Sequence, residues 1–264
     1  IEARKATARA AFAKWEADLK PEMVGGPPPA EGLLFHAPLD EGKDVRVKLT
    51  VAGKARTVGV TGANWTDGKA GKALDVGPTT KLEVKDAADL IHPAPFSYGA
   101  WVRLGPGATN GALFGRMDEG SAFRGWDLWL EGGRPGAHVI HSWPGDAVKV
   151  VAKTPLKQGQ WHHLFITYDG SGKADGLQIY IDGERQKDRE VQAASLRSST
   201  SVKVPFKLAQ RNTTSRVNNF AIQDLRVYGR ALSALEVGQL AGGGRIGAIA
   251  AKPSARRTPA EKEL

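Results

Sequence analysis

The stretch Trp161-His-His-Leu-Phe-Ile-Thr-Tyr168, with Leu177-Gln-Ile-Tyr-Ile-Asp-Gly183 shortly after it, decides the fold of this chain. Both runs are rich in β-branched and aromatic residues, and Leu177–Ile181 alternates between its two faces, which is typical of β-strands. Asp182 and Gly183 tolerate positive φ, so they favour a two-residue hairpin turn. The stretch therefore predicts antiparallel strands joined by tight turns.

The same rhythm continues outward in both directions. Phe96–Leu104 alternates in the same way, and Gly, Pro, Asp and Asn interrupt the chain about every ten residues. Further strands are predicted over residues 112–116, 126–131, 136–142 and 220–228. No helical pattern separates them, so we expect an all-β fold: a two-sheet antiparallel jelly-roll sandwich.

The flanks of this β-region differ from it in pattern. Ala8, Phe12, Trp15 and Leu19 form one stripe of an amphipathic helix, and Ser233-Ala-Leu-Glu236 is a capping box that opens a short C-terminal helix. The helix in residues 1–24 is interpreted as the edge of a neighbouring domain or a brace against the core. The predicted organisation is this helix, a Gly/Pro linker at 25–31, the jelly roll at 32–241 and a flexible connector at 242–264.

Composition excludes several kinds of site. The 264 residues contain no Cys, which rules out disulfides and thiolate chemistry within the chain, and no apolar stretch is long enough for a membrane helix. Lys and Arg outnumber Asp and Glu by 37 to 28. One basic zone, Val191–Gln223, has no carboxylate, but its few aromatic residues argue against base stacking, so we do not expect a nucleic-acid ligand. An anionic glycan or simple solvation are the alternatives for these charges: Arg197, Lys203, Lys207, Arg211 and Arg216.

Residues 156–170 together with 177–183 resemble the most characteristic segment of laminin G-like domains, in the concanavalin A-like lectin/glucanase superfamily. Phe96–Leu104, Ala73–Gly77 with Lys81–Val84, and Ile222–Ser233 extend this resemblance over residues 32–241. It implies a jelly roll of two curved sheets that acts as a non-catalytic, extracytoplasmic module and binds a glycan or a protein surface. Similar modules also occur inside large bacterial proteins with a cytochrome c domain, so a structural spacer between neighbouring domains is the alternative.

Hydrolytic relatives in this superfamily use an E-x-D-x-x-E motif, which this sequence lacks. The nearest carboxylates, Asp127 and Glu131, share one face of a predicted strand but are four residues apart, too far for a retaining glycosidase. Common motifs for serine hydrolases, zinc proteases, P-loops and EF-hands are also missing. We therefore expect no enzyme, and a divergent glycoside hydrolase is the third alternative.

Sugar binding requires an aromatic platform and fixed polar partners. Trp126 shares parity with Leu128 and Leu130 and is assigned to the core, whereas Trp129 shares parity with Asp127 and is the better surface aromatic. Packing is the alternative role for each candidate. The candidate ligand-binding residues are Trp101, Arg103, Arg116, Asp127, Trp129, His138 and Arg211.

A cation site is also implied by the resemblance, since many laminin G-like modules hold calcium with oxygen ligands. Asp40, Asp75 and Asp224 lie in segments that resemble neighbouring strands, so they are the candidate calcium ligands, with turn or surface roles as the alternative. His162 and His163 are adjacent on a strand and point to opposite faces, so they are not expected to share one metal ion.

Overall fold

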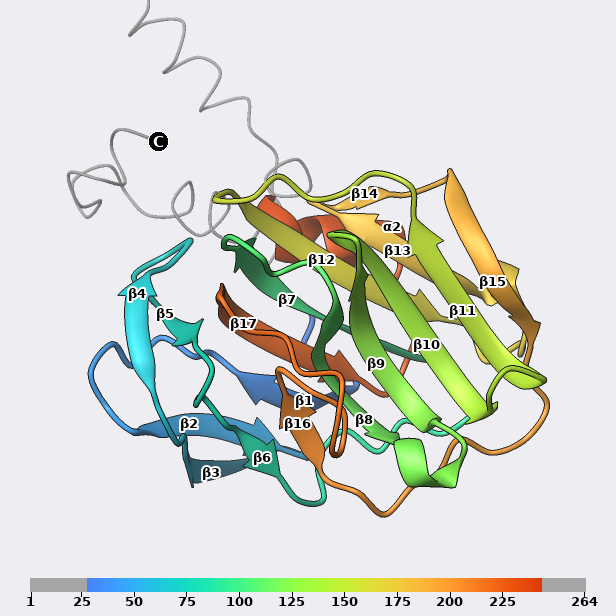
Figure 1. Ribbon diagram of the computed structural model, residues 1–264, viewed down its shortest axis with the longest axis horizontal. Helices are drawn as coiled ribbons and strands as arrows, with labels where there is room; N and C mark the ends of the chain where they lie inside the picture. The colour runs from blue at the N-terminus through green and yellow to red at the C-terminus, as the bar shows by residue number, and fades with distance from the viewer. Residues whose placement is uncertain (1–27, 244–264) are drawn as a thin grey trace, which may run out of the picture. The chain divides into compact units, whose positions relative to one another are not determined.

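The computed structural model describes residues 28–243, which contain two β-sheets (Figure 1). The predicted helix in residues 1–24 and all but the first two residues of the predicted connector lie outside the described residues. Residues 30–233 form one compact unit, which is the jelly-roll sandwich that the sequence predicts.

The first sheet has ten strands in the described part of the chain. They are β1 (Leu33–Ala37), β2 (Arg46–Val51), β3 (Lys54–Gly59), β4 (Asn64–Asp67), β5 (Lys72–Val76), β7 (Phe96–Leu104), β12 (Trp161–Tyr168), β13 (Leu177–Ile181), β14 (Glu184–Arg185) and β17 (Phe220–Tyr228). Its main path runs β14-β13-β12-β7-β17-β1-β2-β3, and β5 pairs with β17 beside that path.

The second sheet has seven described strands in the order β15-β11-β10-β9-β8-β16-β6. They are β6 (Glu83–Val84), β8 (Gly111–Asp118), β9 (Arg124–Glu131), β10 (Arg134–Ser142), β11 (Asp146–Ala152), β15 (Arg189–Ser195) and β16 (Phe206–Leu208). In Figure 1, β8, β9, β10 and β11 form the front layer, over β7, β12 and β17 of the other sheet.

The predicted hairpin is confirmed. Strand β13 ends at Ile181 and β14 begins at Glu184, so Asp182 and Gly183 form the turn with φ of +53° and +85°. The turn has a second role that the sequence pattern did not indicate. The Asp182 carboxylate accepts the backbone N–H of His163 and lies 2.8 Å from Nδ1 of His162, which ties the hairpin to β12.

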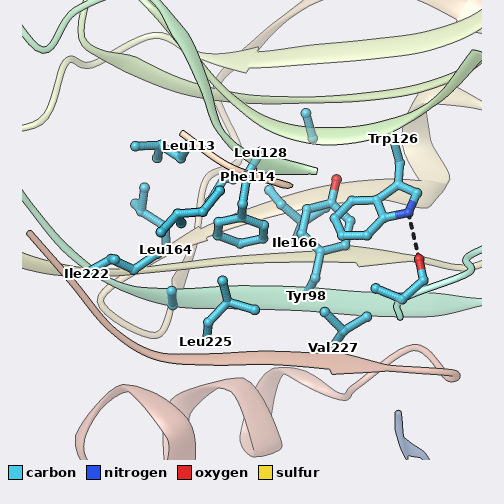
Figure 2. Packing of buried hydrophobic residues seen from close by; sticks show 14 of the residues in the cluster. Tyr98, Leu113, Phe114, Trp126, Leu128, Leu164, Ile166, Ile222, Leu225 and Val227 are labelled. Carbon is cyan, nitrogen blue, oxygen red and sulfur yellow. Dashed lines mark hydrogen bonds between the residues drawn. The ribbon is translucent and has the colours of Figure 1, made fainter. Parts of the chain in front are cut away.

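The core lies between the two sheets and is rich in aromatic rings (Figure 2). Trp126 is 1% exposed, and its ring centroid lies 4.4 Å from that of Tyr98 on the opposite sheet. The indole Nε1 of Trp126 donates to the carbonyl of Ala88, and the Tyr98 hydroxyl donates across the core to the carbonyl of Asp127 at 2.9 Å. The assignment of Trp126 to the core is therefore confirmed, and Tyr98 links the two sheets.

Strand β9 positions the candidate site through simple alternation. Trp126, Leu128 and Leu130 belong to the core cluster, so Asp127 and Trp129 project from the other face of the seven-stranded sheet. Asp127 and Trp129 thus lie on the face of β9 that points away from the core.

The short C-terminal helix is also confirmed. It is α2 (Ala234–Gly238), which continues into the π-helical turn η4 (Gln239–Gly243), and both lie in a second unit. Among residues 28–243, no helix is both long enough and apolar enough to cross a membrane.

Candidate functional site

The site begins as one row of residues across the outer face of the seven-stranded sheet. Asp127 on β9 pairs with His138 on β10, which pairs with Lys149 on β11. The row ends in small residues on both sides, Gly115 on β8 and Ala193 on β15. The three polar side chains therefore lie side by side between two small residues.

The carboxylate of Asp127 is the centre of this row. It is fully buried, and its Oδ1 lies 2.7 Å from Nδ1 of His138 while its Oδ2 accepts Nε of Arg211 at 2.8 Å. Burial raises the pKa of Asp127, but His138 and Arg211 outweigh burial and lower that pKa to about 2. Asp127 is therefore ionised at neutral pH, and it holds two side chains in place.

The tautomer of His138 follows from this arrangement. Burial lowers the pKa of His138 against the opposing effect of Asp127, so the ring is neutral at neutral pH. An ionised carboxylate only accepts hydrogen bonds, so Nδ1 carries the proton and donates it to Asp127. The other nitrogen, Nε2, then keeps its lone pair and has no partner among the described residues, which leaves it as an acceptor for a ligand.

Arg211 lies on the loop that follows β16, 84 positions after Asp127 in the sequence. Its backbone N–H donates to Thr214, and the next residue, Asn212, donates its N–H to the carbonyl of Met117 on β8. Glu119 accepts the backbone N–H groups of Thr213 and Thr214, which fixes the tip of the loop. The loop is thus anchored on the edge of the same sheet.

Three aromatic rings surround the polar row. The Arg211 guanidinium lies 4.4 Å from the ring centroid of Trp129 and 5.4 Å from that of Phe123. The Lys149 ammonium lies 5.7 Å from the ring centroid of Trp143, and His138 meets Trp129 and Trp143 edge-to-face. Such contacts hold cations and rings together at fixed positions.

The two outer rings, Phe123 and Trp143, lie on the β8–β9 loop and the β10–β11 loop. Ala122 and Phe123 have φ of +55° and +62°, a conformation that non-glycine residues rarely adopt. The N–H of Trp143 donates to the carbonyl of Ala122 at 3.0 Å, which joins the β8–β9 loop to the β10–β11 loop. Phe123 and Trp143 remain 36% and 37% exposed, so both rings are available to a ligand.

These residues enclose a pocket of about 210 Å³ on the outer face of the sheet. Its lining residues are Phe123, Trp129, His138, Ile140, Trp143, Lys149 and Arg211. One indole donor there, Nε1 of Trp129, is buried and has no partner in the described structure.

Four of the seven predicted binding residues therefore meet at one site: Asp127, Trp129, His138 and Arg211. Trp101 and Arg103 lie elsewhere, on β7 of the ten-stranded sheet. Trp101 packs against His163 at 5.2 Å between ring centroids and has Lys69 over its face, while Arg103 donates to Thr66 and lies over Trp161. The structure thus separates the candidates onto two sheets.

Arg116 is engaged inside the fold. It is 8% exposed, and its guanidinium donates to the carbonyls of Ala87, Val202 and Val204. Asp89 lies 3.4 Å from it. All three guanidinium nitrogens donate hydrogen bonds, so Arg116 connects β8 to two loops. Arg116 does not line the pocket.

The candidate calcium ligands have separate partners. Asp224 accepts from His36 and Arg226, and Asp75 accepts from Asn64, while Asp40 is exposed. Within residues 28–243, no group of three His, Asp or Glu side chains is placed to hold a metal ion. Calcium binding by these aspartates remains a prediction without a converging side-chain geometry.

Most cationic side chains of the basic zone Val191–Gln223 make hydrogen bonds or ion pairs within the protein. Arg216 donates to the carbonyls of Gly77, Pro78 and Thr80, and Lys207 donates to that of Asn212. Arg211 is paired with Asp127. Arg197 donates to the carbonyl of Gly145, so four of the five cations have partners within the described structure.

Sequence reasoning did not select Lys149, Phe123 or Ile140 for this site. Lys149 is a lone charge within the apolar run of β11, and that contrast is a signal that could have found it. Phe123 depends on the unusual backbone of its loop, which has no simple sequence signature.

Comparison with solved structures shows the fold. The binding domain of Paraclostridial Mosquitocidal Protein 1 superposes with a TM-score of 0.59 at 18% identity, over 80% of this chain and 52% of that chain. The Botulinum Neurotoxin serotype G binding domain superposes with a TM-score of 0.53 at 17% identity, over 79% of this chain and 50% of that chain. The chain thus spans about half the length of these toxin domains.

A third similar structure covers a whole domain. It is Domain 4 of AbnA, a GH43 extracellular arabinanase from Geobacillus stearothermophilus, in complex with arabinotriose. Its TM-score is 0.50 at 19% identity, over 79% of this chain and 98% of that one.

The sequence itself gives the family. A search of curated proteins found no significant relative. The laminin G-type family model of the concanavalin A-like lectin/glucanases superfamily matches residues 76–238, which include every residue that lines the pocket. Because that match covers more than half of the 264 residues, the chain belongs to the concanavalin A-like lectin/glucanases superfamily.

Proposed function

We propose that the jelly roll is a non-catalytic carbohydrate-binding module and that its ligand site is the pocket lined by Trp129, His138, Trp143, Lys149 and Arg211. One observation carries the proposal: three aromatic rings stand around a polar network whose orientation is fixed by a buried carboxylate. Rings contact the apolar faces of sugars, and fixed polar groups select their hydroxyls.

The carboxylates of the site support binding over hydrolysis. A glycosidase needs one carboxyl group with a raised pKa to act as the acid. Asp127 has a lowered pKa, and the pKa of Glu131 is also lowered, because bonds from Lys149 and Gln192 outweigh the effect of burial. Both groups are therefore ionised and already hydrogen-bonded at neutral pH.

The similar solved structures support the same class of function. Two are binding domains of toxins, and the third belongs to an extracellular enzyme and was solved with arabinotriose. We extend this to the present chain as a proposal, with the module acting outside the cytoplasm, as the family resemblance implies.

A glycan array with the purified 264-residue chain tests the function. It should include neutral, uronic-acid and sulfated glycans, and it should be run with calcium and again with a chelator. Selective, saturable binding is the expected result, and sensitivity to the chelator would connect binding to Asp40, Asp75 and Asp224. A blank array with demonstrably folded protein would overturn the proposal and favour a protein ligand or a spacer role.

A further inference from the structure

Each of the two cationic side chains that line the pocket is paired with a carboxylate of the protein. Arg211 is paired with Asp127 at 2.8 Å, and Lys149 is paired with Glu131 at 2.6 Å. His138, the third basic side chain of the lining, is neutral at neutral pH because burial lowers its pKa. The pocket therefore presents two cations whose charges are each balanced by a carboxylate immediately behind them.

A cationic ligand does not fit this arrangement. Ligand cations are usually held over aromatic faces. Here the faces of Trp129 and Phe123 are already approached by Arg211, and that of Trp143 is approached by Lys149. A second cation would meet like charge at each ring.

An anionic ligand is disfavoured by the two carboxylates. To pair with Arg211 or Lys149, a carboxylate or sulfate on the ligand would have to approach Asp127 or Glu131, both ionised. Like charges at such distances repel, most strongly where water is excluded. Asp127 is fully buried and is not able to turn away into solvent.

Hydroxyl groups match the free hydrogen-bonding capacity of the pocket. A hydroxyl donates one hydrogen bond and accepts others. Nε2 of His138 is a free acceptor, while Arg211 and Lys149 retain N–H groups that are not used in the described structure. One hydroxyl can therefore donate to His138 while it or its neighbour accepts from a cation.

The size of the pocket limits how much ligand it takes. Its volume of about 210 Å³ is below the roughly 300–1,000 Å³ of pockets that enclose drug-sized ligands. One sugar ring suits this space, and the remainder of a longer glycan would lie in solvent.

We propose that the pocket takes a single uncharged sugar ring, with one hydroxyl donating to Nε2 of His138. This proposal rests on the proposed carbohydrate-binding function and specifies its ligand class. The shared chemistry is that of a neutral monosaccharide unit, whether free or at the end of a chain.

The test is titration calorimetry on the full chain with matched neutral and anionic probes. The neutral probes are methyl glycosides of common hexoses and pentoses together with arabinotriose, and the anionic probes are glucuronic acid, galacturonic acid and a heparin disaccharide. We expect a neutral probe to bind, with an affinity that changes less than about twofold between low and high salt, because no new ion pair forms.

Glu131→Gln supplies the discriminating variant. Its side chain is part-exposed, and the amide oxygen of glutamine can still accept from Arg134 and Gln192, so we expect the fold to remain while Lys149 loses its counter-charge. We expect the variant to gain about tenfold in affinity for a uronic acid, an effect that falls as salt rises. Glu184→Gln, an exposed site on β14, is the matched control and should change neither affinity.

The outcomes separate the two proposals. If the natural chain prefers the anionic probes and loses affinity in salt, or if it binds arabinotriose but no single ring, the inference is wrong while carbohydrate binding stands. If Glu131→Gln gains no affinity for uronic acids, the role given to the balanced charges is wrong. If none of the neutral or anionic probes binds, the proposed function falls and this inference falls with it.

Discussion

Oδ1 of Asp127 lies 2.7 Å from Nδ1 of His138, and the two residues are direct partners across β9 and β10. This contact fixes the ring tautomer of His138 and leaves Nε2 free beside the aromatic rim. The free hydrogen-bonding groups of the pocket therefore depend on a carboxylate that does not itself line the pocket. Asp127 is a positioning residue, which makes its removal informative about stability as well as affinity.

Asp127→Asn should destabilise the protein strongly. The substitution keeps the side-chain shape but leaves the Arg211 guanidinium buried without its counter-charge, which costs about 3–5 kcal/mol in comparable buried pairs. Urea denaturation followed by tryptophan fluorescence measures the loss. Asp188→Asn is the control, because its ion pair with Lys153 is exposed and should contribute less than about 1 kcal/mol. Equal losses in the two variants would show that Asp127 does not hold a buried charge network.

Trp143→Ala should abolish most sugar binding without unfolding the protein. The ring is 37% exposed and contacts only the rim of the pocket, so its loss removes a stacking surface rather than core volume. We expect at least about a tenfold loss in affinity, measured by calorimetry. Trp161→Ala on β12 is the matched control, since this indole stacks with Arg103 on the other sheet. Equal affinity losses in both variants would place the ligand elsewhere.

Arg116→Met should lower stability and leave sugar affinity unchanged. The variant keeps an unbranched side chain but removes the hydrogen bonds to Ala87, Val202 and Val204, a loss on the order of 3 kcal/mol. Thermal unfolding and calorimetry measure the two effects separately. A loss of affinity in the folded variant would contradict the purely structural role assigned to this arginine.

The free energy of unfolding should fall as the pH drops from 6.5 towards 4. Burial lowers the pKa of His163 from 6.5 to about 4, so the unfolded chain binds a proton in this range that the folded protein does not. Stability contributed by neutral His163 is complete above pH 6.5 and is lost progressively down to about pH 4, by on the order of 3 kcal/mol. Lowering of the His138 pKa acts in the same direction.

His163→Phe tests this assignment. The histidine ring already stacks on Phe165 at 5.5 Å between centroids, and its Nδ1 has no hydrogen-bond partner, so an apolar ring suits the position. Chemical denaturation at a series of pH values should show a flatter dependence in the variant, with the part due to His138 remaining. A slope unchanged from the natural protein would assign the pH dependence to other groups.

The sequence predicts best the strands that combine aromatic and β-branched residues. Phe96–Leu104, Trp161–Tyr168, Leu177–Ile181 and Phe220–Tyr228 are found with the predicted limits. Strand β11 was missed because it has no aromatic residue and Lys149 interrupts its short apolar run. Strand β15 was missed because most of its side chains are polar or exposed.

The site was predictable where parity along one strand was enough. Trp129 and Asp127 follow from the inward direction of Trp126, but parity does not tell which sheet a strand joins, so Trp101 and Arg103 were grouped with them. Lys149 required the register between β10 and β11. Such long-range pairings depend on the whole topology and are not written in any local pattern.

Arg211, the cationic partner of Asp127, is separated from it by 84 positions along the chain. A growing polypeptide therefore completes β8, β9, β10 and β11 before the residue that neutralises this buried carboxylate has been synthesised. In a chain that stops short of Arg211, Asp127 lacks this counter-charge and the pocket lacks one of its lining residues. The pocket is thus complete only once the chain extends through Arg211, and a fragment ending before β16 would carry most of the described strands without a complete pocket.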